Sequence, residues 1–192
     1  MPAAARPGRR IMVATMRAAE QEIGDEVLIR RANSGDGEAF GTLYTRYARM
    51  VHGILLSRVP FCEAEDLVQE VFVSALRKLA LLREPGAFRG WLASIARNRA
   101  IEYHRGARDT VELHENSAAG RAGQADQHEA LEILEIICKL PEAYRETLIL
   151  RLVEGMTGPE IAERTGMTHQ SVRVNLHRGI KMLRERLGGT TP

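Results

Sequence analysis

The chain of 192 residues has few aromatic residues, only two cysteines and no long apolar run. Aromatics make up 5% of it, which disfavours β-sandwiches and barrels and suits helices packed through Leu, Ile, Val and Ala. Cys62 and Cys138 are far apart and form no C-x-x-C motif, so neither a disulfide framework nor a zinc site is indicated. We expect both to be small buried apolar side chains in a reducing compartment, the cytoplasm. No apolar stretch approaches the roughly 18 residues of a membrane span, so we expect no membrane insertion.

Catalytic signatures are also missing. The six histidines do not occur at H-E-x-x-H or similar spacing, and no glycine-rich phosphate loop, nucleophile elbow or pair of carboxylates in an apolar setting is present. The sequence therefore predicts no catalytic residues, no metal and no cofactor. An enzyme with a DNA-binding tail would need a catalytic constellation that these residues do not supply.

Net charge is only +2, so affinity for nucleic acid would have to come from segregated charges. Segregation is present. Residues 83–108 contain six basic and two acidic residues, whereas residues 61–72 contain four acids and no base. The two stretches therefore predict separate surfaces for separate partners.

Apolar residues recur at helical spacing and no segment alternates with a period of two, so the predicted fold class is all-α. Residues 106–129 are rich in Gly, Ala, Ser, Asp and Gln and predict a flexible, slightly acidic linker between two small helical domains. The predicted parts are a disordered basic arm (1–24), a first domain (25–105), the linker (106–129), a second domain (130–187) and a tail (188–192). The first domain should hold helices at about 25–33, 36–59, 63–82 and 88–105. Contact of the arm with DNA is possible, but disorder alone explains its composition.

The second domain ends in a predicted helix-turn-helix. Thr157 and Glu160 form a capping box, in which each side chain accepts from the other residue's backbone amide. Gly166 supplies the permissive backbone of a sharp turn, and Thr168 caps the next helix. Its stripe of apolar residues consists of Val172, Leu176, Ile180, Leu183 and Leu187.

The remaining faces of that last helix carry mostly cations, as expected of a major-groove reader. The residues predicted to lie at base edges or beside them are Thr168, His169, Gln170, Ser171, Arg173, Val174 and His177. Arg178, Lys181 and Arg184 are better placed for phosphates, which orient a protein without reading sequence. The alternative is an ordinary amphipathic helix with a solvated charged face, which the ordered turn before it disfavours.

Two further surfaces belong to the first domain. Inward-facing Leu67, Val71 and Ala75 would leave Asp66, Gln69 and Glu70 on one outer stripe of their helix, next to Glu65. Compensation of the helix dipole explains the acids of the first turns, whereas a docking face for a basic helical partner explains why no base appears before Arg77. The second surface surrounds the sole tryptophan and suits single-stranded DNA with a pocket for an unstacked base. Its members are Phe88, Arg89, Trp91, Arg97, Asn98, Arg99, His104 and Arg105, although Trp91 itself is more simply explained as core.

These motifs, in this order, resemble the sigma factors of bacterial RNA polymerase, specifically the small extracytoplasmic-function (ECF) group. The sequence DGEAF at 36–40 is similar to the family's opening segment, and EAEDLVQEVF at 63–72 is similar to its polymerase-binding helix, the most specific signature. FRGWL at 88–92 followed by IARN at 95–98 resembles the segment that melts and reads the minus-ten element. Residues 140–187 resemble the domain that reads the minus-thirty-five element.

The resemblance implies a transcription initiation factor without catalysis of its own. Glu65, Asp66, Gln69 and Glu70 would bind the clamp helices of the largest polymerase subunit, and the second domain would lie near the flap of the second largest. The loop at 82–88 would cradle a flipped minus-ten base, and an anti-sigma factor is an expected partner. Two features depart from the family: Val174-Asn175 where Ser-Arg is frequent, and an arm longer than usual.

The runner-up interpretation is a stand-alone helix-turn-helix regulator whose first domain senses a ligand or dimerises. It would bind a palindromic site without polymerase. The acidic helix and the long polar linker argue against it.

Overall fold

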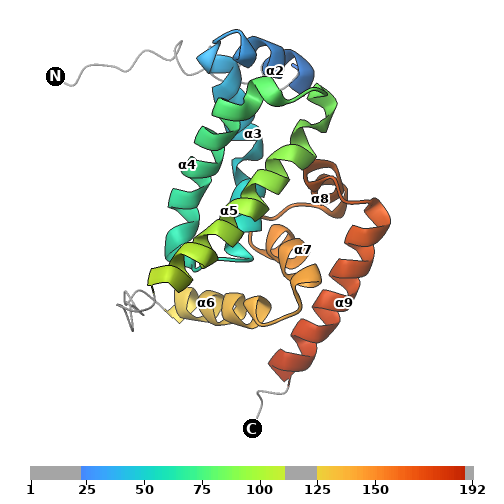
Figure 1. Cartoon of the computed structure of the whole chain (residues 1–192). Helices are drawn as coiled ribbons and strands as arrows, with labels where there is room; N and C mark the ends of the chain where they lie inside the picture. Colours follow the sequence, from blue (N-terminus) through green and yellow to red (C-terminus); the bar gives the residue numbers. More distant parts are fainter. Residues whose placement is uncertain (1–22, 111–124, 189–192) are drawn as a thin grey trace, which may run out of the picture.

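The computed structural model describes residues 23–110 and 125–188, and they confirm the all-α prediction, with no strand among them (Figure 1). The α-helices are α2 (Asp25–Asn33), α3 (Gly37–Leu56), α4 (Phe61–Lys78), α5 (Phe88–Thr110), α6 (Ala125–Cys138), α7 (Glu142–Leu152), α8 (Gly158–Thr165) and α9 (His169–Gly188). Short 3-10 turns, η1 (Leu79–Leu81) and η2 (Pro85–Ala87), lie between α4 and α5.

Helices α2 to α5 form the N-terminal domain, in which α3 packs against the other three. The Asp36 side chain accepts from the Ala39 amide at 3.1 Å and caps α3. Pro60 precedes α4 with φ −56°, where its missing N–H costs nothing. The core is mostly aliphatic and contains two aromatic groups. In one, the fully buried Phe88 ring lies 5.5 Å from Tyr47 and 5.9 Å from Trp91, and in the other the Phe72 ring lies 4.5 Å from Tyr44.

Helices α6 to α9 form the C-terminal domain, and its helix-turn-helix is confirmed. The Thr157 hydroxyl accepts from the Glu160 amide, and the Glu160 carboxylate accepts from the Thr157 amide at 2.7 Å. Gly166 ends α8 with φ +76°, a left-handed conformation that favours glycine. The Thr168 hydroxyl accepts from the Ser171 amide at 3.1 Å and starts α9.

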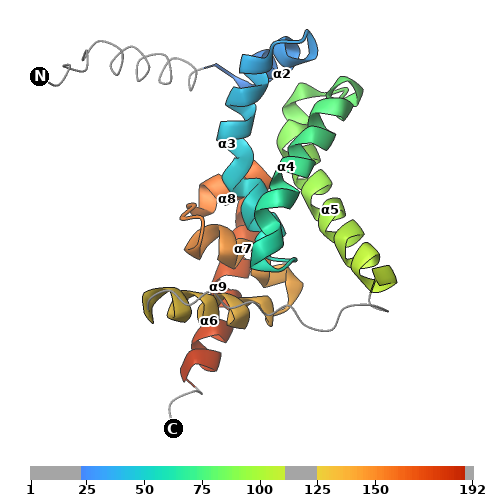
Figure 2. The same ribbon diagram turned by 90° about the vertical axis from the view of Figure 1, so that its left-hand side faces the viewer.

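The two domains lie against each other: α7 and α8 pack between α3 and α5 on one side and α9 on the other (Figures 1 and 2). Two glycines permit the closest approaches. A Cβ at Gly53 in α3 would lie 2.6 Å from Leu150 Cδ2 in α7, so the absence of a side chain lets these helices meet across the domain boundary. A Cβ at Gly179 in α9 would lie 2.9 Å from Leu148 Cδ1, within the C-terminal domain.

Several expectations require correction. Helix α5 continues to Thr110 and α6 begins at Ala125, so the stretch expected to be a linker (106–129) is helical at both ends, and residues 111–124 lie outside the described ranges. Leu76 in α4 and Ile101 in α5 are apolar side chains at the surface, each 49% exposed. Cys62 is exposed on the first turn of α4, and Cys138 is half-buried, where burial raises its pKa.

Candidate polymerase and nucleic-acid interfaces

The acidic stripe, which we define as Glu65, Asp66, Gln69 and Glu70, lies on the outer face of α4, and all its members are exposed. Buried Leu67, Val68 and Val71 occupy the opposite side of the helix. Beyond the stripe, toward the end of α4, two apolar side chains are also exposed: Val73, which is 48% exposed, and Leu76. The stripe is therefore an accessible acidic surface bordered by apolar side chains, which suits a basic amphipathic partner.

The stripe is connected to α5 by an ion pair. The Arg99 guanidinium donates to Glu70 Oε2 at 2.7 Å through Nε and lies 2.6 Å from it through Nη2, while Glu102 is 3.5 Å from Nη1. Arg99 is 29% exposed and Glu70 52%, so the pair stands at the surface, where its contribution to stability is small.

The residues expected to contact the minus-ten element lie along α5 in different environments. Phe88 is fully buried in the core, and Trp91 is partly buried against it, as the simpler explanation of the tryptophan predicts. Asn98 and Arg105 are exposed. The phenyl ring of Phe88 therefore anchors the start of α5 in the core, whereas Asn98 and Arg105 lie at the surface.

Two arginines of α5 are paired with carboxylates of the C-terminal domain. Arg89 Nη1 donates to Glu163 Oε1 of α8 at 2.9 Å, and its Nε lies 3.7 Å from Asp25. Arg97 donates to Glu146 of α7 through two parallel bonds, Nε to Oε2 at 3.1 Å and Nη2 to Oε1 at 2.7 Å. This hydrogen bonding raises the pKa of Arg97 further above its usual value.

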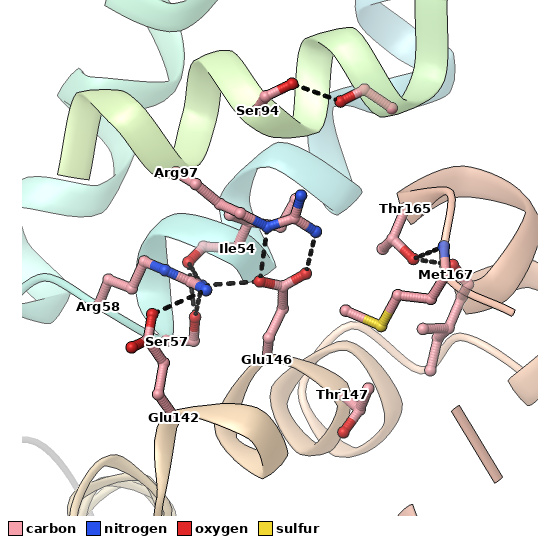
Figure 3. A network of polar contacts seen from close by, with 12 residues as sticks. Ile54, Ser57, Arg58, Ser94, Arg97, Glu142, Glu146, Thr147, Thr165 and Met167 are labelled. Atoms are coloured by element: carbon pink, nitrogen blue, oxygen red, sulfur yellow. Dashed lines mark hydrogen bonds and ion pairs between the residues drawn. The ribbon is translucent and has the colours of Figure 1, made fainter. Parts of the chain in front are cut away.

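Glu146 accepts from a second arginine as well (Figure 3). Arg58, in the α3–α4 corner, places Nη1 2.8 Å from Glu146 Oε2, while the same guanidinium donates to Ile54 O and to Ser57 Oγ. The Glu146 side chain is only 3% exposed and Arg58 13%. A buried carboxylate thus joins the two domains through two cations.

A third interdomain contact lies in the C-terminal half of α3. His52 Nδ1 lies 2.6 Å from Glu154 Oε1, and Arg49 Nε lies 3.6 Å from Glu154 Oε2. The hydrogen bond to Glu154 raises the pKa of His52 above its ordinary value of 6.5, and Glu65 adds to the effect. His52 and Glu154 line one hollow together with Glu65 and Gln69, so this contact adjoins the acidic stripe.

The recognition helix α9 faces solvent. Val172 and Leu183 are buried against the domain, and Val174 is half-buried. The exposed positions from its cap onward include Thr168, His169, Gln170, Ser171, Arg173, His177, Arg178 and Lys181. Lys181 lies 3.9 Å from Glu185 one turn on, a surface pair that leaves the lysine accessible. The cationic face of α9 is therefore accessible to solvent.

Sequence reasoning missed the residues that hold the domains together: Gly53, Arg58, Glu146 and Glu154. Helix α7 contained a signal that could have been used, because Glu146 and Thr147 stand beside Leu148, Ile149 and Leu150, and all five are buried. A carboxylate inside a helix buried on every side requires a cation from elsewhere in the chain.

Along residues 23–110 and 125–188, no helix combines the length and the apolar character needed to cross a bilayer. Within the same ranges, no group of three or more His, Cys, Asp or Glu side chains is arranged to hold a metal ion.

Comparison with known proteins agrees with this arrangement. The family model for Sigma-70 region 2 matches residues 43–110, and that for Sigma-70, region 4, matches residues 130–183. The ECF RNA polymerase sigma-E factor of Escherichia coli (strain K12) is 32% identical over 158 residues, covering 74% of this chain and 83% of that protein. The ECF RNA polymerase sigma factor BldN of Streptomyces coelicolor is 28% identical over 166 residues, covering 81% of this chain and 63% of that protein.

Among solved structures, CnrH in complex with the cytosolic domain of CnrY is similar with a TM-score of 0.61 and 25% identity, over 87% of this chain and 99% of that one. The sigma factor RpoE of Bartonella quintana, in complex with the anti-sigma factor NepR, shares the fold with a TM-score of 0.55 and 20% identity, over 79% and 98%. With an acidic stripe on α4, cations along α5 and an exposed recognition helix at the positions of the two sigma-70 regions, the chain belongs to the ECF RNA polymerase sigma factors, transcription initiation factors that are not enzymes as a family.

Proposed function

We propose that this chain binds core RNA polymerase through α4 and directs it to promoters that α5 and α9 recognise. The observation that carries the proposal is that an exposed acidic surface and cationic side chains lie on three different helices of a small all-helical protein, the acids on α4 and the cations on α5 and α9. The three surfaces can act together only when a large partner and DNA are present at once.

The acidic stripe is the proposed contact with polymerase. Its members Glu65, Asp66, Gln69 and Glu70 would face the clamp helices of the largest subunit, and the C-terminal domain would lie at the flap of the second largest. Surface charges of this kind set orientation and the rate of encounter more than they set affinity. Exposed Val73 and Leu76 add the apolar area that a stable contact needs.

The polar face of α5 is the proposed minus-ten surface. Arg97, Asn98, Arg99 and Arg105 would follow the backbone of the melted strand, and the loop at 82–88 would hold an unstacked base. Capture of that base offsets the few kcal/mol lost when it leaves the stack, so promoter opening uses binding energy alone. Buried Phe88 would act by fixing the loop.

Helix α9 is the proposed reader of the minus-thirty-five element. Gln170 and Arg173 can make bidentate contacts to base edges, each contributing about 1–3 kcal/mol of discrimination. Arg178 and Lys181 would bind phosphates, so Lys181→Ala should weaken binding to every sequence and reduce the slope of log affinity against log salt by about one.

The relatives suggest a further partner and a location. CnrH and RpoE were each solved with a bound protein, and NepR is named an anti-sigma factor. We infer that an anti-sigma factor also binds this chain, and that the chain works in the cytoplasm, where polymerase and promoters are found.

Runoff transcription with reconstituted holoenzyme tests the proposal. The purified chain should bind core polymerase and direct initiation from selected promoter sequences, and Asp66→Lys should abolish both. Glu135→Lys is the matched control, since Glu135 is 74% exposed on α6, away from the stripe. Failure of the unmodified chain to bind core polymerase would refute the proposal, whereas a palindromic footprint without polymerase would support a stand-alone regulator.

A further inference from the structure

Glu146 is the most completely buried acid of the described residues that belongs to an interdomain ion pair. Its two partners come from the other domain: Arg97 from α5 and Arg58 from the α3–α4 corner. Figure 3 shows both guanidinium groups converging on this one carboxylate. The N-terminal domain therefore presents a site for an anion, and in this structure the anion is the Glu146 carboxylate of the C-terminal domain.

We propose that Arg58 and Arg97 form a phosphate site for single-stranded DNA, and that Glu146 fills this site in a closed, autoinhibited form of the chain. The proposal rests on the proposed function, because the strand concerned is the melted promoter strand. It assigns a binding role to Arg58, which lies outside the polar face of α5 described above.

The geometry of the pairing supports an anion site. Arg97 meets Glu146 with two parallel N–H···O bonds of 3.1 and 2.7 Å, the fork arrangement that guanidinium groups use for carboxylates and phosphates alike. Arg58 is held from its own domain by Ile54 O at 3.2 Å and Ser57 Oγ at 2.6 Å. Arg58 therefore keeps its position when the C-terminal domain and Glu146 move away, and its guanidinium can then bind another anion.

The closed packing also covers the start of α5. A Cβ on Gly166, in the turn of the helix-turn-helix, would lie 3.5 Å from Gly90 Cα, so this turn rests on the first turn of α5. Arg164 of α8 donates to Arg46 O of α3 at 2.8 Å, and Arg89 pairs with Glu163. A nucleic-acid strand following α5 must displace these contacts.

The two domains can be forced apart by a substitution that changes no cation. Leu150 packs directly against Gly53. A Cβ at Gly53 would lie only 2.6 Å from Leu150 Cδ2, so Gly53→Gln should force α7 away from α3. Gly41 is in the same helix, and no described atom lies within 4 Å of a Cβ added there, so Gly41→Gln is the matched control.

Glu146→Gln is the second opening variant and removes the charge that holds both arginines. Its control is Glu135→Gln, which makes the same change on α6, where the side chain is 74% exposed. Small-angle X-ray scattering of the full chain should give a larger radius of gyration for both opening variants and the unmodified value for both controls. Unmodified values for both opening variants would overturn the closed form.

Binding of a labelled single-stranded oligothymidylate to the free chain is the functional measurement. Since apparent affinity scales with the fraction of molecules in the competent form, opening should raise it about tenfold or more. Arg58→Met in the Gly53→Gln background should cancel most of this gain and lower the salt slope by about one. Retention of the full gain in the double variant would overturn the assignment of Arg58.

Inorganic phosphate alone distinguishes a general anion site from a strand-specific one. We expect it to leave the radius of gyration of the unmodified chain unchanged and to compete weakly with the oligonucleotide in Gly53→Gln. Expansion of the unmodified chain by phosphate would overturn the role of the strand. Failure of the proposed function would instead appear as loss of core polymerase binding by the unmodified chain, which none of these measurements involves.

Discussion

Two helices carry cations along their surfaces, α5 in the N-terminal domain and α9 in the C-terminal domain, and they differ in what those cations meet. On α5, Arg89 and Arg97 pair with carboxylates of the opposite domain. On α9, Arg173 and Arg178 are exposed to solvent, and Lys181 lies 3.9 Å from Glu185 of the same helix.

The difference separates two kinds of recognition. A duplex needs a helix that is already accessible, and α9 provides one. A melted strand exists only after polymerase has engaged the promoter, so a surface for it can be covered until then. The packing of α7 and α8 against α3 and α5 provides this cover.

The largest expected effect comes from removing the buried carboxylate. Glu146→Ala leaves Arg58 and Arg97 in place without their shared anion, and breaking a buried pair from one side costs about 3–5 kcal/mol. Differential scanning calorimetry should show the single transition of the unmodified chain resolving into separate transitions for the two domains. Glu135→Ala should cost less than about 1 kcal/mol, because its ion pair with Lys139 on α6 is largely exposed. Equal effects of the two variants would contradict the interdomain role of Glu146.

The packing of α9 against α7 can be tested at Gly179. Gly179→Leu places atoms where Leu148 and Tyr144 already lie within 3.2 Å of a Cβ, and overpacking of this kind costs about 1–3 kcal/mol. Urea denaturation should show the loss, and duplex binding through α9 should fall with it. Gly188→Leu, at the end of the same helix with open space around its Cβ, should behave as the unmodified chain. An unchanged midpoint for Gly179→Leu would show that α9 can shift without loss.

A substitution on the exposed face of α9 should change sequence discrimination without affecting the covered surface of α5. Arg173→Ala should lower discrimination at one upstream position by about 1–3 kcal/mol and leave oligothymidylate binding unaltered. Selection of promoter sequences with holoenzyme measures this preference. A change at the minus-ten positions instead would contradict the separation of the two surfaces.

The smallest expected effect is a pH dependence of the closed packing. Because the pKa of His52 is raised by Glu154, its contribution is complete below about pH 6.5 and is lost as pH rises through the raised value. Scattering should therefore show a more compact chain at pH 6 than at pH 8. Arg49 and Glu65 are the other charged groups that face this pair. His52→Gln should remove the pH dependence, and its persistence in this variant would assign it to another group.

Much of the fold could be predicted because its signals are local. The capping box at Thr157, the turn at Gly166 and the cap at Thr168 each depend on residues within one or two turns, and all three are confirmed. The exposure of the acidic stripe follows from the inward positions of Leu67 and Val71, which period-3.6 reasoning locates well.

The closed packing could not be predicted because its determinants are distant in sequence. Arg97 and Glu146 are separated by 49 residues, and His52 and Glu154 by 102, so no periodicity relates them. Helix ends were also misjudged: α5 extends to Thr110 through Gly106, a residue that composition assigns to a linker. The residue-level roles of the polymerase and DNA surfaces stay predictions.

The ion pair between Arg99 and Glu70 has a consequence for thermodynamic linkage. One belongs to the proposed DNA surface and the other to the proposed polymerase surface, so a basic group of polymerase that engages Glu70 competes for the carboxylate that holds Arg99. Each ligand then makes the other's binding easier by the same factor, because coupling free energies are reciprocal. For a surface pair worth less than about 1 kcal/mol, that factor is at most about fivefold, enough to bias the order of assembly without making either step obligatory.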